Sequence, residues 1–288
     1  MSISLEMKNI AIPNKKALEE KIEKIKKSGI KALHVISDFD RTLTKAFVKG
    51  KFVPSLISVL RDGNYLTPNY AEKAHALFNK YHPIEASQEI PIEEKKEKMH
   101  EWWTSHFQLL IKSGLNKRDL ERAVETGNVE FRKGAEKFLD ILHDNNIPLV
   151  ILSSSGLGGD AIEIFLRKHK RLYDNIHIIS NVYEWDKKGN AIGVKEPIIH
   201  TLNKHEVELK NLPVYQEIKN RKNIILLGDG IDDLGMVEGF PYKTLIKVGF
   251  LNQDVDKLLT SYKENFDVVI TNDSGMNYVN KLVKSLRN

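Results

Sequence analysis

The chain of 288 residues contains no cysteine. Disulfide bonds, thiolate nucleophiles and zinc–thiolate sites are therefore excluded. Its ten histidines show no HExxH or other zinc-binding spacing, so we interpret them as structural. Because a chain without cysteine suits a reducing compartment, we expect a cytoplasmic protein.

Long apolar segments are also missing. Residues 1–13 contain no apolar core of the kind that signal peptides carry. No apolar run approaches the ~18 residues that cross a bilayer, so we expect no membrane partner. Neither internal repeats nor low-complexity segments are visible.

The composition is that of an ordinary globular protein, with 41% hydrophobic and 29% charged residues. The length suffices for one large domain or for a core with a smaller domain. The net charge of +5 comes mostly from scattered lysines, which we interpret as a solvated surface. We therefore expect no nucleic acid polymer as a partner, and we expect a monomer.

Short apolar runs alternate with helical patterns over most of the chain. Helices are predicted at residues 14–28 and 160–169 from the spacing of their apolar residues. Such alternation predicts an α/β fold, with a doubly wound, mostly parallel sheet forming a Rossmann-like core. The predicted strands span residues 32–37, 148–152, 176–179, 223–227, 244–248 and 267–270.

Residues 52–130 interrupt this alternation, because they lose the strand signal and show only helical patterns. Helices are predicted there at residues 71–80, 92–114 and 117–127. We interpret 52–130 as an inserted helical cap that selects the substrate. The core would then consist of residues 1–51 and 131–288.

Polar residues follow three of the predicted strands. Asp38 and Asp40 follow the first strand, Ser153–Ser155 follow the strand at 148–152, and Asp229 to Asp233 follow the strand at 223–227. In open parallel sheets, ligands bind beyond the carboxyl ends of the strands. We therefore expect these side chains to converge on one edge of the sheet. A donor set of oxygens without His or Cys favours Mg²⁺.

This combination of groups predicts phosphoryl transfer. A carboxylate beside Mg²⁺ can attack phosphorus and form an aspartyl phosphate, while a lysine and hydroxyl donors neutralise the phosphoryl oxygens. A second carboxylate can protonate the leaving oxygen and then activate water. If the strand continues past Asp38, the two-residue spacing points Asp38 and Asp40 the same way.

Less specific interpretations of the same residues exist. Asp38 and Asp40 could be turn aspartates, and Asp232 could cap a following helix. The stretch Gly156–Ala161 matches the G-x-G-x-x-A pattern of dinucleotide-binding proteins, but the next strand ends in Ser180 and Asn181 rather than in an acid. A catalytically inactive scaffold would have lost the nucleophile or a metal-binding aspartate, and both are present.

The motifs resemble those of the haloacid dehalogenase-like phosphatases. Asp38-Phe39-Asp40-Arg41-Thr42 fits their DxDxT motif, Ser154 their second motif, and Gly228-Asp229 to Asp233 their GDxxxD motif. The chain is similar over nearly its whole length to the cytosolic type III pyrimidine 5′-nucleotidase family. The stretches that carry this likeness are 36–43, 81–85, 101–104, 154–158, 199–205 and 224–234.

The resemblance implies a role for each matching residue. Asp38 would be the nucleophile, and Asp40 the proton donor whose backbone carbonyl also binds Mg²⁺. Asp229 would be a metal ligand, with Asp233 supporting the metal site. The residues implied in substrate binding are Ser154, Ser155 and Lys204 for the phosphate (not the nearer Lys195), Glu85 for the nucleobase, and Trp102 and Trp103 as aromatic packing or stacking groups.

The resemblance also implies the reaction, which is Mg²⁺-dependent hydrolysis of UMP and CMP, with phosphate transfer to another nucleoside as a side activity. The alternatives are 7-methyl-GMP, phosphoserine or a sugar phosphate as substrate. The chain departs from the family pattern by an extra glycine near Gly159. Ser105 or His106 stands where the family places a base-contacting serine.

Overall fold

A seven-stranded sheet forms the centre of the protein in a computed structural model, which describes residues 9–53, 55–63, 65–87, 89–127, 129–204 and 211–287. The strand order is β1-β11-β10-β9-β2-β5-β6, and β1 alone among them pairs antiparallel. The strands are β1 (Ile10–Ala11), β2 (Leu33–Ser37), β5 (Leu149–Leu152), β6 (Ile176–Ile179), β9 (Asn223–Gly228), β10 (Thr244–Leu251) and β11 (Val268–Thr271).

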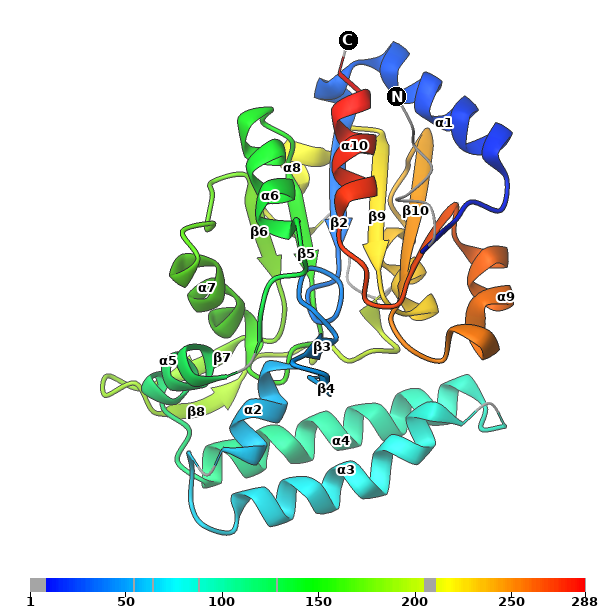
Figure 1. Cartoon of the computed structure of the whole chain (residues 1–288). Coiled ribbons are helices and arrows are strands. Elements are labelled where there is room, and N and C mark those ends of the chain that lie inside the picture. Colours follow the sequence, from blue (N-terminus) through cyan, green and yellow to red (C-terminus); the bar gives the residue numbers. More distant parts are fainter. Residues whose placement is uncertain are drawn as a thin grey trace.

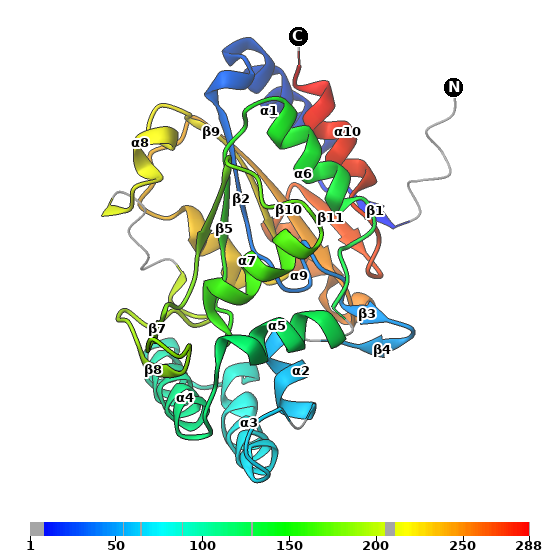
Figure 2. The same ribbon diagram turned by 90° about the vertical axis from the view of Figure 1, so that its left-hand side faces the viewer.

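Both faces of this sheet are covered, because successive strand residues point to opposite sides. Val35 packs into the core beneath α1, α6 and α10, whereas Ile36 packs into a second core beneath α8. In Figure 2, α6 and α10 lie on one side of the sheet and α8 lies on the other. These helices are α1 (Lys15–Ser28), α6 (Ala135–Asp144), α7 (Gly158–Lys168), α8 (Tyr215–Ile218), α9 (Val255–Asn265) and α10 (Asn277–Ser285).

The predicted doubly wound α/β fold is confirmed. Each predicted strand is present within a few residues of its expected bounds. Three features carried too weak a pattern to be predicted: the antiparallel edge strand β1, the hairpin of β3 (Phe47–Val48) and β4 (Lys51–Phe52), and the hairpin of β7 (Tyr183–Trp185) and β8 (Ala191–Val194). β1, β3, β4 and β7 have only two or three residues each, which is too short to show a periodicity.

Four helices from the middle of the chain lie beyond the carboxyl ends of the strands (Figure 1). They are α2 (Leu56–Asp62), α3 (Tyr70–Ala86), α4 (Ile92–Lys112) and α5 (Lys117–Thr126). The β7–β8 hairpin is joined to them by backbone hydrogen bonds, since Ala191 donates to Leu115 and Lys117 donates to Gly189. The helical block thus also contacts a hairpin from outside residues 52–130.

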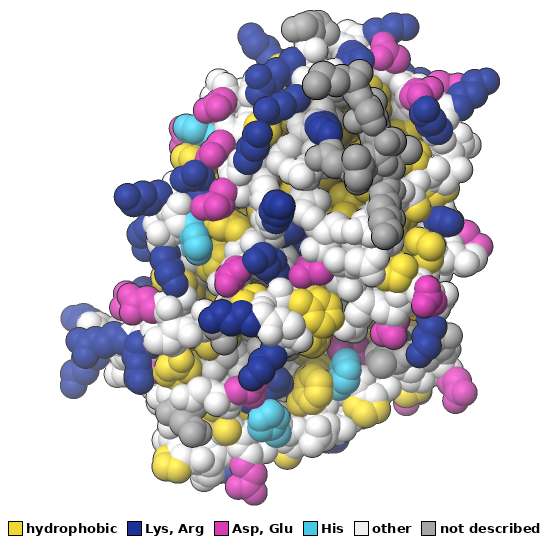
Figure 3. All heavy atoms as spheres, viewed as in Figure 1, with side chains coloured by type: hydrophobic (Ala, Val, Ile, Leu, Met, Phe, Trp, Pro, Cys, Tyr) yellow, Lys and Arg dark blue, Asp and Glu magenta, His cyan; other side chains and the backbone are white. Residues whose placement is uncertain are grey.

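Charged side chains of both signs are dispersed over the face shown in Figure 3. This mixture agrees with a solvated, lysine-rich surface. Within the described ranges, no helix combines the length and apolar character that a membrane span needs.

Candidate active site

The turn that follows β2 carries the first pair of acids. β2 ends at Ser37, and the Asp38 N–H still donates to the Leu227 carbonyl of β9 at 3.0 Å. The chain then turns, with the Leu43 N–H donating back to the Phe39 carbonyl at 3.0 Å and Arg41 at a φ of 58°. Strand geometry therefore does not continue to Asp40, and it is the turn that directs this residue.

Lys204 joins the ends of two strands. Its Nζ lies 2.5 Å from Asp38 Oδ1 and 2.7 Å from Asp233 Oδ1, and all three side chains are buried. Lys204 lies in the segment that follows β8 and is far from both acids in the sequence. The structure thus brings together the three residues to which the resemblance assigns nucleophile, phosphate ligand and metal support.

Asp233 has a second role in the loop after β9. Its Oδ2 accepts hydrogen bonds from the backbone N–H groups of Asp229 and Gly230, each at 3.0 Å. The expectation that Asp232 caps the following turn is therefore wrong: Asp233 makes these bonds, while Asp232 is exposed. Asp233 thereby fixes the backbone that carries Asp229, and Tyr262 Oη donates to the Asp229 carbonyl at 2.5 Å.

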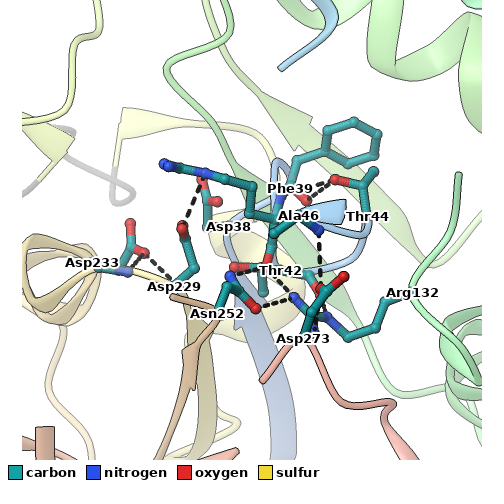
Figure 4. Close-up of polar contacts among 12 residues, drawn as sticks. Asp38, Phe39, Thr42, Thr44, Ala46, Arg132, Asp229, Asp233, Asn252 and Asp273 are labelled. Atoms are coloured by element: carbon teal, nitrogen blue, oxygen red, sulfur yellow. Dashed lines mark hydrogen bonds and ion pairs between the residues drawn. The ribbon is translucent and has the colours of Figure 1, made fainter. Parts of the chain in front are cut away.

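Arg41 is the second cation of the site. Its Nε lies 3.1 Å from Asp229 Oδ2, so the residue inside the DxDxT motif pairs with an acid from another strand. Figure 4 shows Asp38, Asp229 and Asp233 close together. Arg41 and Lys204 thus offset part of the negative charge that these carboxylates concentrate.

Burial is the largest single influence on the pKa of each of these groups. It raises the pKa of Asp40 to about 7, and the neighbouring Arg41 opposes this rise. Burial likewise raises the pKa of Asp38 and of Asp229, and the carboxylate of Asp233 raises both further. Burial lowers the pKa of Lys204, but its two carboxylate partners outweigh this effect, so the Lys204 ammonium remains charged. A carboxyl group with the pKa of Asp40 can exchange a proton near neutral pH.

The carboxylates of Asp38, Asp229 and Asp233 also meet the requirements of a metal site. Each offers an oxygen, and these oxygens lie within 4.8 Å of one another. An oxygen-only set at the edge of the sheet suits a hard divalent cation. Asp40 is not part of this carboxylate group, which agrees with a contribution through its backbone carbonyl only. The residues present therefore fit a Mg²⁺ ion.

The serine loop lies at the end of the neighbouring strand β5, whose Ile151 is paired in register with Ser37. Ser154 is half-buried, and Ser155 is buried with its Oγ accepting from the Leu157 N–H at 3.3 Å. The loop leads directly into α7 at Gly158. The structure thus places both serines at the carboxyl end of the strand next to β2, in the loop that leads into the N-terminus of a helix, where backbone N–H groups favour anions.

The helical block reaches this site at two points. Trp103 Nε1 in α4 donates to the Ser154 carbonyl at 3.2 Å. Thr201 Oγ1 donates to Glu85 Oε1 at 2.8 Å, and Thr201 is three residues from Lys204. Trp102 instead is buried and stacks on Tyr81, with ring centroids 5.8 Å apart. Trp103 therefore contacts the serine loop and Glu85 contacts the segment that carries Lys204, whereas Trp102 is a packing residue.

The two residues that could replace a base-contacting serine differ in their surroundings. His106 Nε2 lies 3.1 Å from Tyr70 Oη, and burial lowers the pKa of His106 to about 4. This histidine is thus neutral and engaged within the helical block. Ser105 is half-buried in the same helix.

Several residues around the site carried no sequence signal. Arg41 lies inside the DxDxT motif, but the motif specifies no residue type at this position. Tyr262 and Thr201 contact Asp229 and Glu85 from distant segments, and no local pattern marks them. Arg132 and Asp273 form a buried ion pair beneath the turn after β2, at 3.1 Å. The chain fold alone reveals these four contacts.

Comparison with known proteins gives one consistent family. The family model described as pyrimidine 5′-nucleotidase (UMPH-1) matches residues 41–287. A human 7-methylguanosine phosphate-specific 5′-nucleotidase is 34% identical over 270 residues, covering 93% of this chain and 89% of its own. A putative cytosolic 5′-nucleotidase 3 from Caenorhabditis elegans is 35% identical and covers 98% of this chain and 77% of its own.

Solved structures agree with this family. The crystal structure of cytosolic 5′-nucleotidase IIIB bound to cytidine superposes with a TM-score of 0.88 at 26% identity, covering 97% of this chain and 94% of its own. An aspartyl-phosphate analogue of a phosphoserine phosphatase, at 17% identity and a TM-score of 0.51, shares the fold. The dinucleotide-binding alternative is thereby overturned, and Gly158 has a packing reason: a Cβ there would lie 2.6 Å from the Asn181 carbonyl. The chain belongs to the pyrimidine 5′-nucleotidase family and is a 5′-nucleotidase.

Proposed function

We propose that the protein hydrolyses pyrimidine nucleoside 5′-monophosphates through an aspartyl phosphate on Asp38, with Mg²⁺ as cofactor. The observation that carries this proposal is the contact of Asp38 with Lys204 at 2.5 Å, within a cluster that includes Asp229 and Asp233. A buried carboxylate can attack an anionic phosphoryl group only when the negative charges of both groups are neutralised. Lys204 neutralises part of this charge.

The metal would be held by the carboxylates of Asp38 and Asp229 and by the backbone carbonyl of Asp40. Asp233 supports this arrangement by orienting the Asp229 backbone. When bound, Mg²⁺ offsets the negative charge of the phosphoryl oxygens and of the attacking carboxylate.

The chain's own residues supply the remaining steps. Lys204, Ser154 and Ser155 bind the phosphoryl oxygens. An oxygen of Asp38 then bonds to phosphorus as the bond to the nucleoside 5′-oxygen breaks, and Asp40 gives its proton to that oxygen. Asp40, now ionised, takes a proton from a water molecule whose oxygen bonds to phosphorus as the bond between phosphorus and the Asp38 oxygen breaks. This step releases phosphate and restores the Asp38 carboxylate and the protonated Asp40. A second nucleoside in place of water would give the phosphotransferase side activity.

Base selection is assigned to the helical block, interpreted as a cap spanning residues 52–130. Glu85 presents a carboxylate, which accepts hydrogen bonds, and both pyrimidines offer it a donor: the exocyclic amine of cytosine and the N3–H of uracil. We therefore expect both CMP and UMP to be hydrolysed. Trp103, whose Nε1 donates to the Ser154 carbonyl, supplies an aromatic surface beside the phosphate loop.

A second candidate substrate is 7-methyl-GMP. The observation that favours it is the similarity of this chain to a human 7-methylguanosine phosphate-specific 5′-nucleotidase, at 34% identity. A cationic methylated base would also be attracted to an indole face and to a carboxylate. Both candidates are nucleoside monophosphates and require the same chemistry at Asp38. A cytoplasmic location and a monomeric state remain predictions.

A substrate screen tests this proposal. Phosphate release would be measured with Mg²⁺ for CMP, UMP, 7-methyl-GMP, AMP, phosphoserine and glucose 6-phosphate. We expect the first three to be preferred by at least about tenfold, since a matched hydrogen bond to a base contributes ~1–3 kcal/mol. Equal rates on all six substrates would contradict a base-reading cap, and inactivity on every nucleotide would contradict the proposed function.

Removal of the nucleophile tests the mechanism. Asp38→Asn keeps the size of the side chain but removes the attacking carboxylate, so turnover should fall to the background rate while the circular dichroism spectrum is retained. Excess chelator should have the same effect on the wild type and be reversed by Mg²⁺. Full activity of the Asp38→Asn variant would exclude an aspartyl phosphate at this residue.

A further inference from the structure

A buried arginine underlies the turn that carries Asp40. The side chain of Arg132 is fully buried, and its Nε donates to the Thr42 carbonyl at 2.7 Å. Its Nη2 donates to the Arg41 carbonyl, and its Nη1 donates to the Ser274 carbonyl at 2.8 Å. The backbone N–H of Arg132 donates to the Leu43 carbonyl at 2.8 Å. One residue thus contacts three consecutive residues of the turn, Arg41 to Leu43.

Two side chains from other strands complete this arrangement. Asn252, just after β10, donates from Nδ2 to the Arg41 carbonyl at 3.0 Å and accepts from Arg132 Nη2 at 2.9 Å. Asp273, just after β11, pairs with Arg132 Nη1 at 3.1 Å and accepts the N–H groups of Ala46 and Phe47, each at 3.0 Å. Figure 4 shows Arg132, Asn252 and Asp273 grouped around Thr42, and we call these three residues the turn clamp.

The turn clamp holds a backbone conformation that has an intrinsic cost. Arg41 has a φ of 58°, and a residue with a Cβ in this left-handed region costs about 1–2 kcal/mol. The two hydrogen bonds to the Arg41 carbonyl offset this cost. Because Arg41 directly follows Asp40, its conformation determines where the Asp40 carboxyl group points.

Asp40 itself has few direct contacts. Its Oδ1 is buried and has no hydrogen-bond partner among the described residues. An acid held by so few contacts depends on its backbone for its direction. An oxygen without a partner is available to a group of the substrate.

We propose that Arg132, Asn252 and Asp273 are positioning residues that aim Asp40 at the oxygen of the leaving group. This inference rests on the proposed function, in which Asp40 donates a proton as the bond between phosphorus and that oxygen breaks. The side chains of the turn clamp contact the backbone that directly follows Asp40. We therefore expect the turn clamp to act on the departure of the leaving group more than on the attack.

Proton donation matters only for poor leaving groups. A nucleoside 5′-alkoxide leaves with a proton, whereas 4-nitrophenolate leaves readily without one. A loosened turn should therefore lower kcat/KM for CMP, which covers the steps up to departure of the leaving group, and should change kcat/KM for 4-nitrophenyl phosphate little. The later hydrolysis of the aspartyl phosphate, in which Asp40 acts as a base, is common to both substrates and does not enter kcat/KM. A defect in overall folding would slow both substrates by the same factor, which separates the positioning role from a structural one.

The experiment compares kcat/KM for these two substrates in Asn252→Ala and Arg132→Lys, with Asp40→Asn as the reference for complete loss of the acid. General acid catalysis contributes about 10²–10⁴-fold, so we expect kcat/KM for CMP to fall about 10–100-fold and kcat/KM for 4-nitrophenyl phosphate to change less than about threefold. Asn175→Ala is the matched control. Asn175 also donates its amide to a backbone carbonyl, that of Ile147, but lies before β6, at the other end of the sheet.

The possible results are distinct. Equal slowing of both substrates, or slowing of neither, would overturn the positioning role. If Arg132→Lys fails to fold, Asn252→Ala decides the test, because it removes neutral hydrogen bonds while the ion pair remains. Wild-type protein that hydrolyses neither substrate would overturn the proposed function itself, which distinguishes that failure from a failure of the inference.

Discussion

At the scale of single residues, the site balances buried carboxylates against two cations. Lys204 contacts Asp38 and Asp233, and Arg41 contacts Asp229. A buried ion pair contributes little net stability, but removing one partner leaves an uncompensated charge and costs about 3–5 kcal/mol. The cations are thus required in the free enzyme as well as with bound phosphate.

Lys204→Met tests this balance. We expect kcat/KM to fall about 100-fold or more, because one charged donor to the phosphoryl group is lost. Thermal unfolding at neutral pH should also show a clear loss of stability, since Asp38 and Asp233 lose their shared partner.

Lys195→Met is the matched control, because Lys195 is exposed and lies only nine positions earlier. Its kinetics and stability should equal those of the wild type. A Lys204→Met variant that keeps wild-type kcat/KM would show that the phosphate is bound by other groups.

At the scale of elements, the passage from β5 to α7 depends on a close backbone contact. Gly158 has a φ of 71°, and its Cα faces the Asn181 carbonyl and the ring of Tyr183. Tyr183 in turn donates to the Gly156 carbonyl at 2.7 Å. The β7 hairpin thereby fixes the loop that contains Ser154 and Ser155.

Gly158→Ala should disturb this contact. A Cβ would lie 2.6 Å from the Asn181 carbonyl, in addition to the cost of the left-handed conformation. We expect a loss of about 2–4 kcal/mol in the free energy of unfolding, measured in urea, and a raised KM because the phosphate loop shifts.

Gly114→Ala separates the two effects, because Gly114 has a φ of 79° but no atom within 4 Å of the added Cβ. It should cost only about 1–2 kcal/mol and leave KM unchanged. Equal losses for the two variants would mean that the contact with Asn181 contributes nothing.

At the scale of the whole molecule, the core on the α8 face of the sheet contains one unusual residue beside Phe240. His34 lies in the central strand β2 and is fully buried, with its ring 5.1 Å from that of Phe240. Its Nδ1 lies 2.8 Å from the Arg221 carbonyl and donates to it. Burial lowers the pKa of His34 to about 4, so this side chain is neutral in the folded protein.

The folded protein should therefore lose stability in weak acid. Below about pH 6.5 the unfolded chain binds a proton at His34 that the folded chain does not bind until about pH 4, so stability falls across this window. From about pH 7 to about pH 5 the loss from His34 is about 2 kcal/mol.

His34→Asn isolates this contribution, because Asn keeps the donor to Arg221 but does not titrate in this range. The drop in unfolding free energy between the two pH values should be smaller in the variant by about 2 kcal/mol. Contributions of the site carboxylates are common to both proteins and cancel in the difference. An identical pH dependence would contradict a neutral, buried His34.

The sequence by itself determined the type of fold and the composition of the site. Apolar runs separated by helical patterns require a covered parallel sheet, and the acids and serines that follow three of these runs must meet at its carboxyl edge. This reasoning identified Asp38, Asp40, Asp229 and the serine loop. Lys204 and Glu85 were identified only through the family resemblance, because single charged residues carry no periodicity.

The tertiary structure decided how these groups are held. Sequence spacing suggested that a straight strand aligns Asp38 with Asp40, but the strand ends at Ser37 and a turn takes its place. That turn is fixed by Arg132, by Asn252 after β10 and by Asp273 after β11. Asp273 lies 232 positions after Arg41 in the sequence. Contacts between such distant segments follow from chain packing, which no local pattern encodes.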